Sequence, residues 1–159
     1  HAPFEKIVYA PWMVVNILTQ QTKNNFGFWQ NEYLDSDSGF LGFIDSSVQY
    51  QGSLKGLQCL TGYYCLKPEH RSQLLTVADH KDRIVNETLR YMRAMVKGPI
   101  QPEAAFIHVM GHAMSIPTPH HLFKTYPEMG NFKFAGADSG RLPLLFDAID
   151  SGIMAATSL

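Results

Sequence analysis

One long helical pattern, at residues 69–96, stands among strand patterns and restricts the folds open to this chain. Pro68 comes directly before the pattern, and Gly98-Pro99 follows it after one residue, so we expect a helix to begin and end there. Apolar residues recur within it at the three- and four-residue spacing of one helix face, namely Leu74, Leu75, Ala78, Ile84, Val85, Leu89, Met92 and Val96. The pattern predicts a single amphipathic helix in this part of the chain.

The remaining patterns predict strands on both sides of this helix. Residues 9–19 are apolar and rich in β-branched side chains, and Pro11 discourages a helix there. We expect one strand before the turn signal "DSDSG" and a second strand after it, at about 40–49. A third strand is expected at 57–66, with a bulge at Gly62, and a fourth at 104–110, which ends before the Pro-rich "SIPTPHH". A last strand at 131–136 precedes a closing helix at 142–157. This order of elements predicts an α+β fold.

Composition limits the classes of partner. Hydrophobic residues make up 45% of the 159 positions and charged residues 17%, a balance typical of a globular protein with a core. A formal net charge of −1 gives no basic surface for nucleic acid. Because no apolar run approaches the roughly 18 residues that span a bilayer, we expect a soluble protein, cytoplasmic or periplasmic, with the compartment left open.

The two cysteines and the start of the chain leave alternatives open. Cys59 and Cys65 are six residues apart, which places both on one face of a strand. We interpret them as small core residues, and a disulfide would require the strand to bend. The start, "HAPFEKIVYA", has neither an initiator Met nor the pattern of a signal peptide, so we expect His1 to be either a mature end after cleavage or the beginning of a fragment.

The ending "NFKFAGADSGRLPLLFDAIDSGIMAA" carries the strongest functional signal. An alternating strand leads into a turn with Gly136, Asp138 and Gly140, and Pro143 suits the first turn of a helix. A helix N-terminus favours a phosphate or the electron-rich edge of a reduced flavin, and a preceding carboxylate accepts hydrogen bonds from ribityl or ribose hydroxyls. The alternative is a plain β-turn-α unit in which Asp138 caps the helix.

This ending resembles the C-terminal FAD-contacting segment of the flavin amine oxidase superfamily, whose pattern is roughly "FAGE…GAxxSGxxAA". Upstream, "YAPWMVVNILT", "FWQNEYLDSDSGFLGFIDSSVQ", "LTGYYCL" and "GHAMSIPTP" are similar, in the same order, to a bacterial branch of related FAD-dependent oxidoreductases. The resemblance covers about residues 9 to 156. It departs from the family pattern at Ala137, which intervenes before the acid, at "WQN" in place of "WDN", and at "GHAM", which lacks a preceding Trp.

The resemblance implies an FAD-dependent oxidoreductase that oxidises a C–N bond of an amine or amino acid. Substrate hydride passes to the flavin, the imine product hydrolyses, and oxygen reoxidises the flavin and forms hydrogen peroxide. Carried over by position, the residues that would contact FAD are Asp138, Gly136, Ala137, Leu144 and Leu145. Those that would line the substrate pocket are His112, Met114, Trp29 and Tyr64. No catalytic residue can be named from the resemblance.

The family's dinucleotide fingerprint G-x-G-x-x-G is not found in the sequence. We therefore expect the chain to be a C-terminal portion, in which residues 1–128 form part of a mixed-sheet substrate domain. Residues 129–159 would supply the last strand and helix of a Rossmann-like FAD domain. A companion chain or segment would carry the fingerprint.

Other function classes remain as alternatives. His108, His112, His120 and His121 cluster in sequence, but two histidines four apart on a strand lie about 13 Å from each other, too far to share a metal ion. Nucleophilic hydrolysis lacks a G-x-S-x-G motif around Ser139. A non-catalytic ligand-binding α+β module remains open, and so does a flavin desaturase or dehydrogenase acting on a C–C bond.

Overall fold

The computed structural model describes residues 7–20, 29–34, 38–49, 56–96, 99–119, 128–138 and 142–157. The chain divides into two compact units. We call Pro11–Gly111 the sheet unit, and we call His1–Ala10 together with His112–Leu159 the terminal unit. The division predicted at residue 128 concerns domains of a larger protein and stays a prediction.

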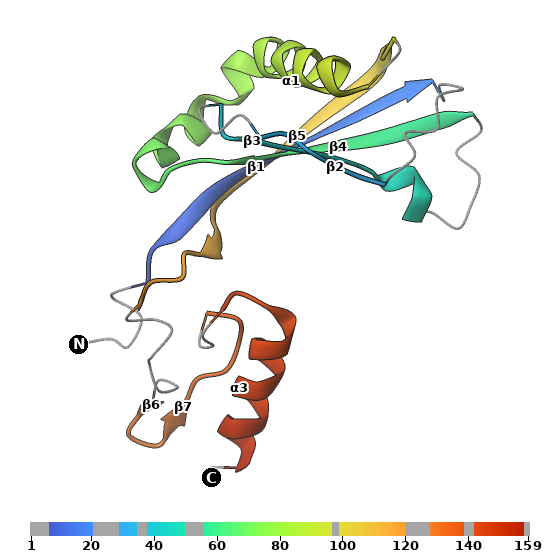
Figure 1. The fold of residues 1–159 in the computed structure, drawn as a ribbon. Helices are drawn as coiled ribbons and strands as arrows, with labels where there is room; N and C mark the ends of the chain where they lie inside the picture. Colours follow the sequence, from blue (N-terminus) through green and yellow to red (C-terminus); the bar gives the residue numbers. More distant parts are fainter. Residues whose placement is uncertain are drawn as a thin grey trace. The chain divides into compact units, whose positions relative to one another are not determined.

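A five-stranded antiparallel sheet, in the order β2-β3-β4-β1-β5, organises the sheet unit (Figure 1). Its strands are β1 (Tyr9–Gln20), β2 (Gln30–Glu32), β3 (Phe40–Asp45), β4 (Leu57–Cys65) and β5 (Pro102–Ser115). With helices beside this sheet, the predicted α+β class is confirmed. The mixed sheet expected of a larger substrate domain is not seen among the described residues, because β2, β3 and β4 follow one another as a meander, which needs no crossover helix.

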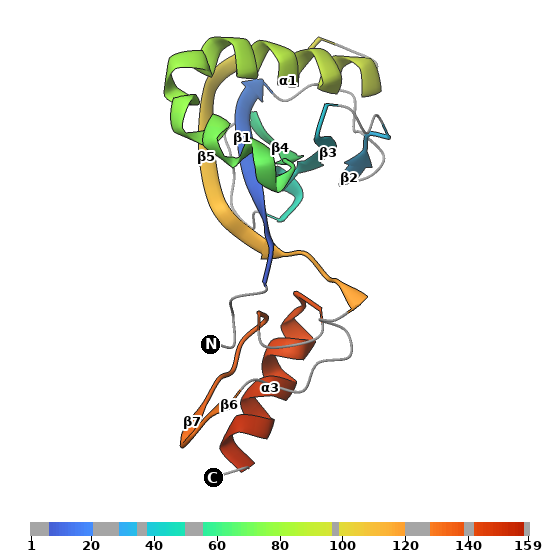
Figure 2. The same cartoon turned by 90° about the vertical axis from the view of Figure 1, so that its left-hand side faces the viewer.

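Helical segments cover one face of this sheet (Figure 2). They are the 3-10 turns η2 (Pro68–Thr76) and η3 (Ala78–His80) and the helix α1 (Lys81–Met95). The predicted 69–96 helix is therefore an α-helix only in its second half. His80, at φ −117° and ψ 15°, lies outside the helical region and separates the two parts.

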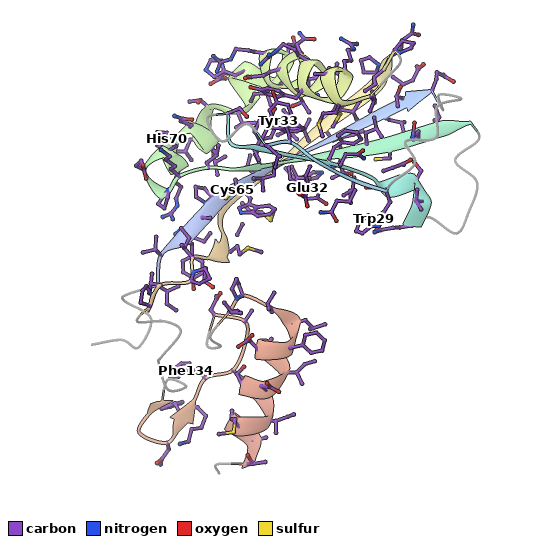
Figure 3. All side chains as sticks on the ribbon, in the orientation of Figure 1. Trp29, Glu32, Tyr33, Cys65, His70 and Phe134 are labelled. Carbon is purple, nitrogen blue, oxygen red and sulfur yellow. The ribbon has the colours of Figure 1, made fainter. Side chains whose placement is uncertain are left out.

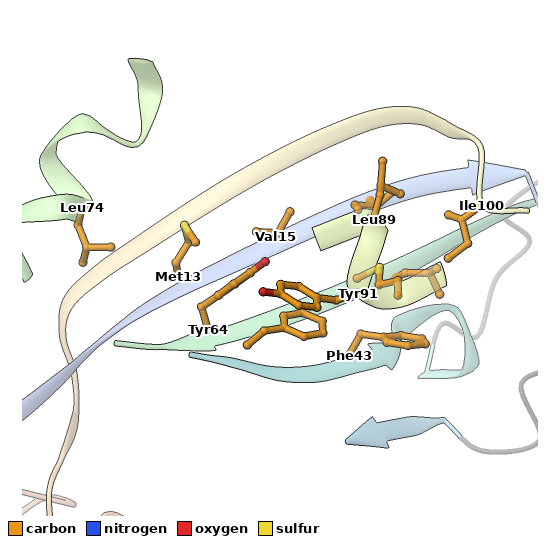
Figure 4. Close-up of a cluster of buried hydrophobic side chains, with 12 residues drawn as sticks. Met13, Val15, Phe43, Tyr64, Leu74, Leu89, Tyr91 and Ile100 are labelled. Carbon is orange, nitrogen blue, oxygen red and sulfur yellow. The ribbon is translucent and has the colours of Figure 1, made fainter. Parts of the chain in front are cut away.

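The core of the sheet unit lies between α1 and the sheet (Figure 4). Alternate residues of β1 and β4 point into it because side chains of a strand alternate between its two faces. Its buried members are Met13, Val15, Ile17, Phe40, Phe43, Leu60, Tyr64, Leu74, Leu89, Tyr91, Met92 and Ile100. Burial of such a set is the main favourable term in forming this unit.

Gly62 serves close packing and not the predicted bulge. It stays in register with Val15 on one side and Phe43 on the other, and the irregularity of the ladder lies between Phe40 and Gly42. A Cβ at position 62 would lie 3.0 Å from Met92 Cε and 3.1 Å from Phe40 Cε2. A methyl group at position 62 would therefore require these side chains to shift by a few tenths of an ångström.

Most strand predictions are confirmed, with changes at their ends. β1 matches the predicted 9–19 strand, and β5 continues through Gly111 to Ser115, further than the predicted 104–110. Residues 46–49, predicted as strand, form the 3-10 turn η1 (Ser46–Gln49). In the Pro-rich segment, Ser115 still belongs to β5 and residues 116–118 have no regular structure, while residues 120–121 lie outside the described residues.

The two cysteines are free and lie outside the core. Both occupy the face of β4 that points away from α1, where they are half-buried. The prediction that they are core residues is therefore wrong. Their shared face follows from their even separation on the strand, but which face it is depends on the position of α1.

The terminal unit contains a short hairpin and a helix. Strands β6 (Glu128–Met129) and β7 (Phe132–Lys133) pair antiparallel, and α3 (Leu145–Thr157) follows the Asp138 turn. The predicted 131–136 strand is thus shorter, and the predicted 142–157 helix begins three residues later, after Pro143. Within the described residues, no helix combines the length and the apolar character needed to cross a bilayer.

Candidate functional site

The carboxylate of Asp138, in the turn before α3, is held by a residue far away in sequence. The hydroxyl of Tyr9 donates a hydrogen bond of 2.9 Å to Asp138 Oδ2. The Tyr9 ring packs edge-on against the ring of His112, with centroids 5.6 Å apart. Burial, together with the hydrogen bond to Asp138 and its negative charge, raises the pKa of Tyr9 to about 12. Tyr9 is therefore a neutral donor at physiological pH.

Ser151 of α3 fixes the backbone at Gly136. The Gly136 N–H donates to Ser151 Oγ at 2.8 Å, and the Ser151 hydroxyl reaches Ala148 O at 2.9 Å and Gly136 O at 3.2 Å. Gly136 has φ +138°, a conformation that side chains disfavour. The predicted cofactor residue Gly136 thus uses its backbone groups inside the unit, where it allows the turn to form beside Asp138.

At the start of α3, the backbone N–H of Leu144 already has a hydrogen-bond acceptor. The Leu144 N–H donates to Leu142 O at 2.8 Å, while Leu144 O accepts from Ala148 N at 3.1 Å. Leu144 thus already uses the N–H group that was predicted to face a flavin. Leu145, where the helix begins, keeps that assignment as a prediction.

Apolar side chains of α3 are exposed to an unusual degree. Leu145 is 72% exposed and Phe146 is 76% exposed. Ile149, Ile153 and Met154 continue the exposed series along the helix. These apolar side chains recur at positions 145, 149 and 153, the four-residue spacing of one helix face.

A separate hollow of about 340 Å³ lies on the sheet unit, over β1 to β4. Aromatic and carboxylate side chains line it, among them Trp12, Trp29, Glu32 and Tyr63. The rings of Trp12 and Tyr63 meet edge to face, with centroids 6.0 Å apart. Figure 3 shows Trp29 and Glu32 on the side of the sheet away from α1, whereas Tyr33 points toward α1.

Of the residues predicted to line a substrate pocket, Trp29 lines this hollow, whereas Tyr64 lies in the core. Tyr64 is 4% exposed, stacks among core aromatics and exchanges a 2.9 Å hydrogen bond with Thr88. Burial raises the pKa of Tyr64 well above its usual value. Its neighbour Tyr63 points to the opposite face of the strand and lines the hollow, and the assignment of Tyr64 to a substrate pocket stays a prediction.

His112 and Met114 both lie at the end of β5 in the terminal unit, where they are exposed. His112, which was predicted to line a substrate pocket, contacts the ring of Tyr9. Tyr9 in turn donates to Asp138, which was predicted to contact the cofactor. His108 lines a different hollow together with Leu74, Leu75 and Lys81. Among the described residues no group of three metal-ligating side chains gathers, and His120 and His121 lie outside them.

The hydrogen-bonding groups at Asp138 are compatible with a flavin cofactor. A carboxylate whose Oδ2 already accepts from Tyr9 keeps further lone pairs for hydroxyl donors such as those of a ribityl or ribose chain. Sequence reasoning singled out Asp138 but not Tyr9, Ser151, Trp12 or Glu32. The alternation of β4 places Tyr63 and Tyr64 on opposite faces of the strand.

Two comparisons of this chain with known proteins found no match. No model of a protein family matches it. No curated protein matches it either.

Proposed function

We propose that this chain is the C-terminal portion of an FAD-dependent oxidoreductase that acts on amines or amino acids. The proposal starts from the ordered resemblance of five segments to the flavin amine oxidase superfamily. One observation carries it further: Tyr9 of the "YAPW" segment donates to Asp138 of the "FAGADSG" segment. Two segments that resemble the same family independently thus meet at the one carboxylate expected to contact the cofactor.

In this proposal the chain holds and orients the cofactor. When bound, FAD would take hydride from the substrate C–H and return the electrons to oxygen. Asp138 would accept a hydrogen bond from a ribityl or ribose hydroxyl, with Tyr9 holding the carboxylate in place. The exposed apolar residues of α3 would pack against the companion segment that carries the dinucleotide fingerprint.

Flavin stoichiometry of the assembled enzyme tests this function. We expect the protein purified from its source to show flavin absorption bands and a companion polypeptide. Asp138→Ala should lower the flavin-to-protein ratio severalfold, since a charged acceptor contributes about 1.5–3 kcal/mol per hydrogen bond. Asp150→Ala, which removes an exposed carboxylate of α3, is the matched control and should retain flavin. A stoichiometry that is equal in both variants would contradict the assignment.

A non-catalytic ligand-binding module is the second candidate, and the aromatic hollow of the sheet unit favours it. A colourless species of the mass of this chain, stable without any companion, would support this candidate over the flavoenzyme. A flavoprotein that bleaches with C–C substrates but not with amines would instead support a desaturase or dehydrogenase.

A further inference from the structure

The hollow over β1 to β4 is built by close approach of the backbone. Gly42 pairs with Glu32 across β2 and β3, and it has φ +125°. A Cβ at this position would collide with the carbonyl oxygen of Asn31. The glycine therefore brings β2 onto β3 and holds Glu32 at the rim of the hollow.

Aromatic rings form the walls of this hollow. Trp12 on β1 and Tyr63 on β4 stand edge to face, and Trp29 directly precedes β2. Trp29 is fixed at its backbone, where its carbonyl oxygen accepts the Asp45 N–H at 2.8 Å. Because Trp29 is nonetheless 49% exposed, its ring can meet a ligand.

Glu32 supplies the negative charge of the hollow. It is the one acidic or basic residue among the described residues that line it. Gln30 Nε2 donates to Glu32 Oε1 at 3.3 Å, which places both side chains on the same side of β2. Burial raises the pKa of the nearby Cys65 thiol, with the Trp12 indole acting in the opposite direction, so this thiol adds no negative charge near pH 7.

Indole and phenol faces attract cations, and a carboxylate at the rim strengthens that attraction. We infer that the hollow binds an organic ammonium group through Trp12, Trp29, Tyr63 and Glu32. This inference deepens the proposed function, because it assigns the substrate class to amines that enter as cations and gives their recognition to the sheet unit. Binding to the hollow itself requires no flavin.

The chain contains two tryptophans, Trp12 and Trp29, and both line the hollow. Intrinsic tryptophan fluorescence of the 159-residue chain therefore reports on this hollow. The probes are choline and its uncharged isostere 3,3-dimethylbutan-1-ol. We expect choline to change the fluorescence saturably, with a Kd on the order of 1 mM, and the neutral isostere to bind at least about tenfold more weakly.

Matched variants assign the effect to residues. Glu32→Gln should weaken choline binding about fivefold, and Trp29→Leu should abolish it, with folding checked by circular dichroism. Glu103→Gln, at the far end of β5 beside Gln20, should leave the affinity unchanged. If Trp29→Leu does not fold, the exposed substitution Glu32→Gln still decides the question.

Equal affinity for choline and its isostere would overturn the inference, and so would a folded chain that shows no saturable response. These results are distinguishable from failure of the proposed function, which the flavin stoichiometry measures separately. Ammonium binding by a protein without flavin would support a binding module. Flavin without ammonium binding would leave an oxidoreductase whose amine is recognised elsewhere.

Discussion

The Tyr9 hydroxyl donates a 2.9 Å hydrogen bond to Asp138 Oδ2 across 129 residues of sequence. This contact joins the beginning of β1 to the turn before α3 within the terminal unit. Val8 O accepts from the Ile116 N–H at 2.7 Å and fixes the same end of β1 against the chain that follows β5. Tyr9 is therefore positioned by backbone pairing, and it in turn positions the carboxylate.

The ionisation of Tyr9 provides a pH test of this contact. The folded-state pKa of about 12 exceeds the unfolded value near 10, so the stabilisation is complete below pH 10 and is lost as the pH rises from 10 to 12. The difference between the ultraviolet titrations of wild type and Tyr9→Phe isolates this phenol. Asp138→Asn should shift its midpoint downward, because the negative charge that opposes ionisation is removed.

The control for this titration is Asp150→Asn, which should leave the midpoint where it is. A Tyr9 midpoint near 10 in the wild-type protein would show that the phenol does not donate to Asp138 in solution. Such a result would also remove the observation on which the flavoenzyme proposal depends.

Ser151→Ala is expected to loosen the Asp138 turn. Ser151 is completely buried, and its removal leaves the Gly136 N–H without the acceptor it now has at 2.8 Å. Loss of a buried hydrogen-bond partner costs about 1–3 kcal/mol, so hydrogen exchange of the Gly136 amide should accelerate roughly 5- to 150-fold.

Thr157→Ala is the matched control for Ser151→Ala. Its hydroxyl bonds to Ile153 O at 2.9 Å but lies at the exposed end of α3, so the Gly136 amide should exchange as in the wild type. Equal protection of Gly136 in both variants would mean that the turn does not depend on Ser151.

Gly62→Ala is expected to destabilise the sheet unit by about 1–3 kcal/mol, the usual range for overpacking a core. The added methyl would lie 3.0 Å from Met92 Cε and 3.2 Å from Thr88 Cγ2, closer than carbon atoms normally approach. Urea denaturation followed by circular dichroism measures the change.

Gly111→Ala is the control for Gly62→Ala, because Gly111 also lies within a strand. Among the described residues, a Cβ there would meet Arg71 at 3.9 Å, which is ordinary van der Waals contact. The free energy of unfolding of Gly111→Ala should stay within about 0.5 kcal/mol of the wild-type value or rise slightly. Equal destabilisation by both substitutions would indicate a general intolerance of alanine in these strands and not the contact with α1.

The local patterns determined most of the elements but not their environments. β-Branched and alternating residues predicted β1 and β4, and proline and glycine marked the limits of the helical region, because these signals depend on neighbouring residues alone. The same signals could not tell 3-10 turns from α-helix before His80, where the backbone leaves the helical region.

The sequence by itself determined that Tyr63 and Tyr64 point to opposite faces of one strand and that Asp138 lies in a turn before a helix. Only the tertiary structure decided that Tyr64 enters the core and Tyr63 the hollow, because that choice depends on which face α1 covers. It also brought Tyr9 to Asp138 and placed Glu32 beside two tryptophans. Contacts between residues distant in sequence depend on the order of the strands, and no local pattern encodes that order.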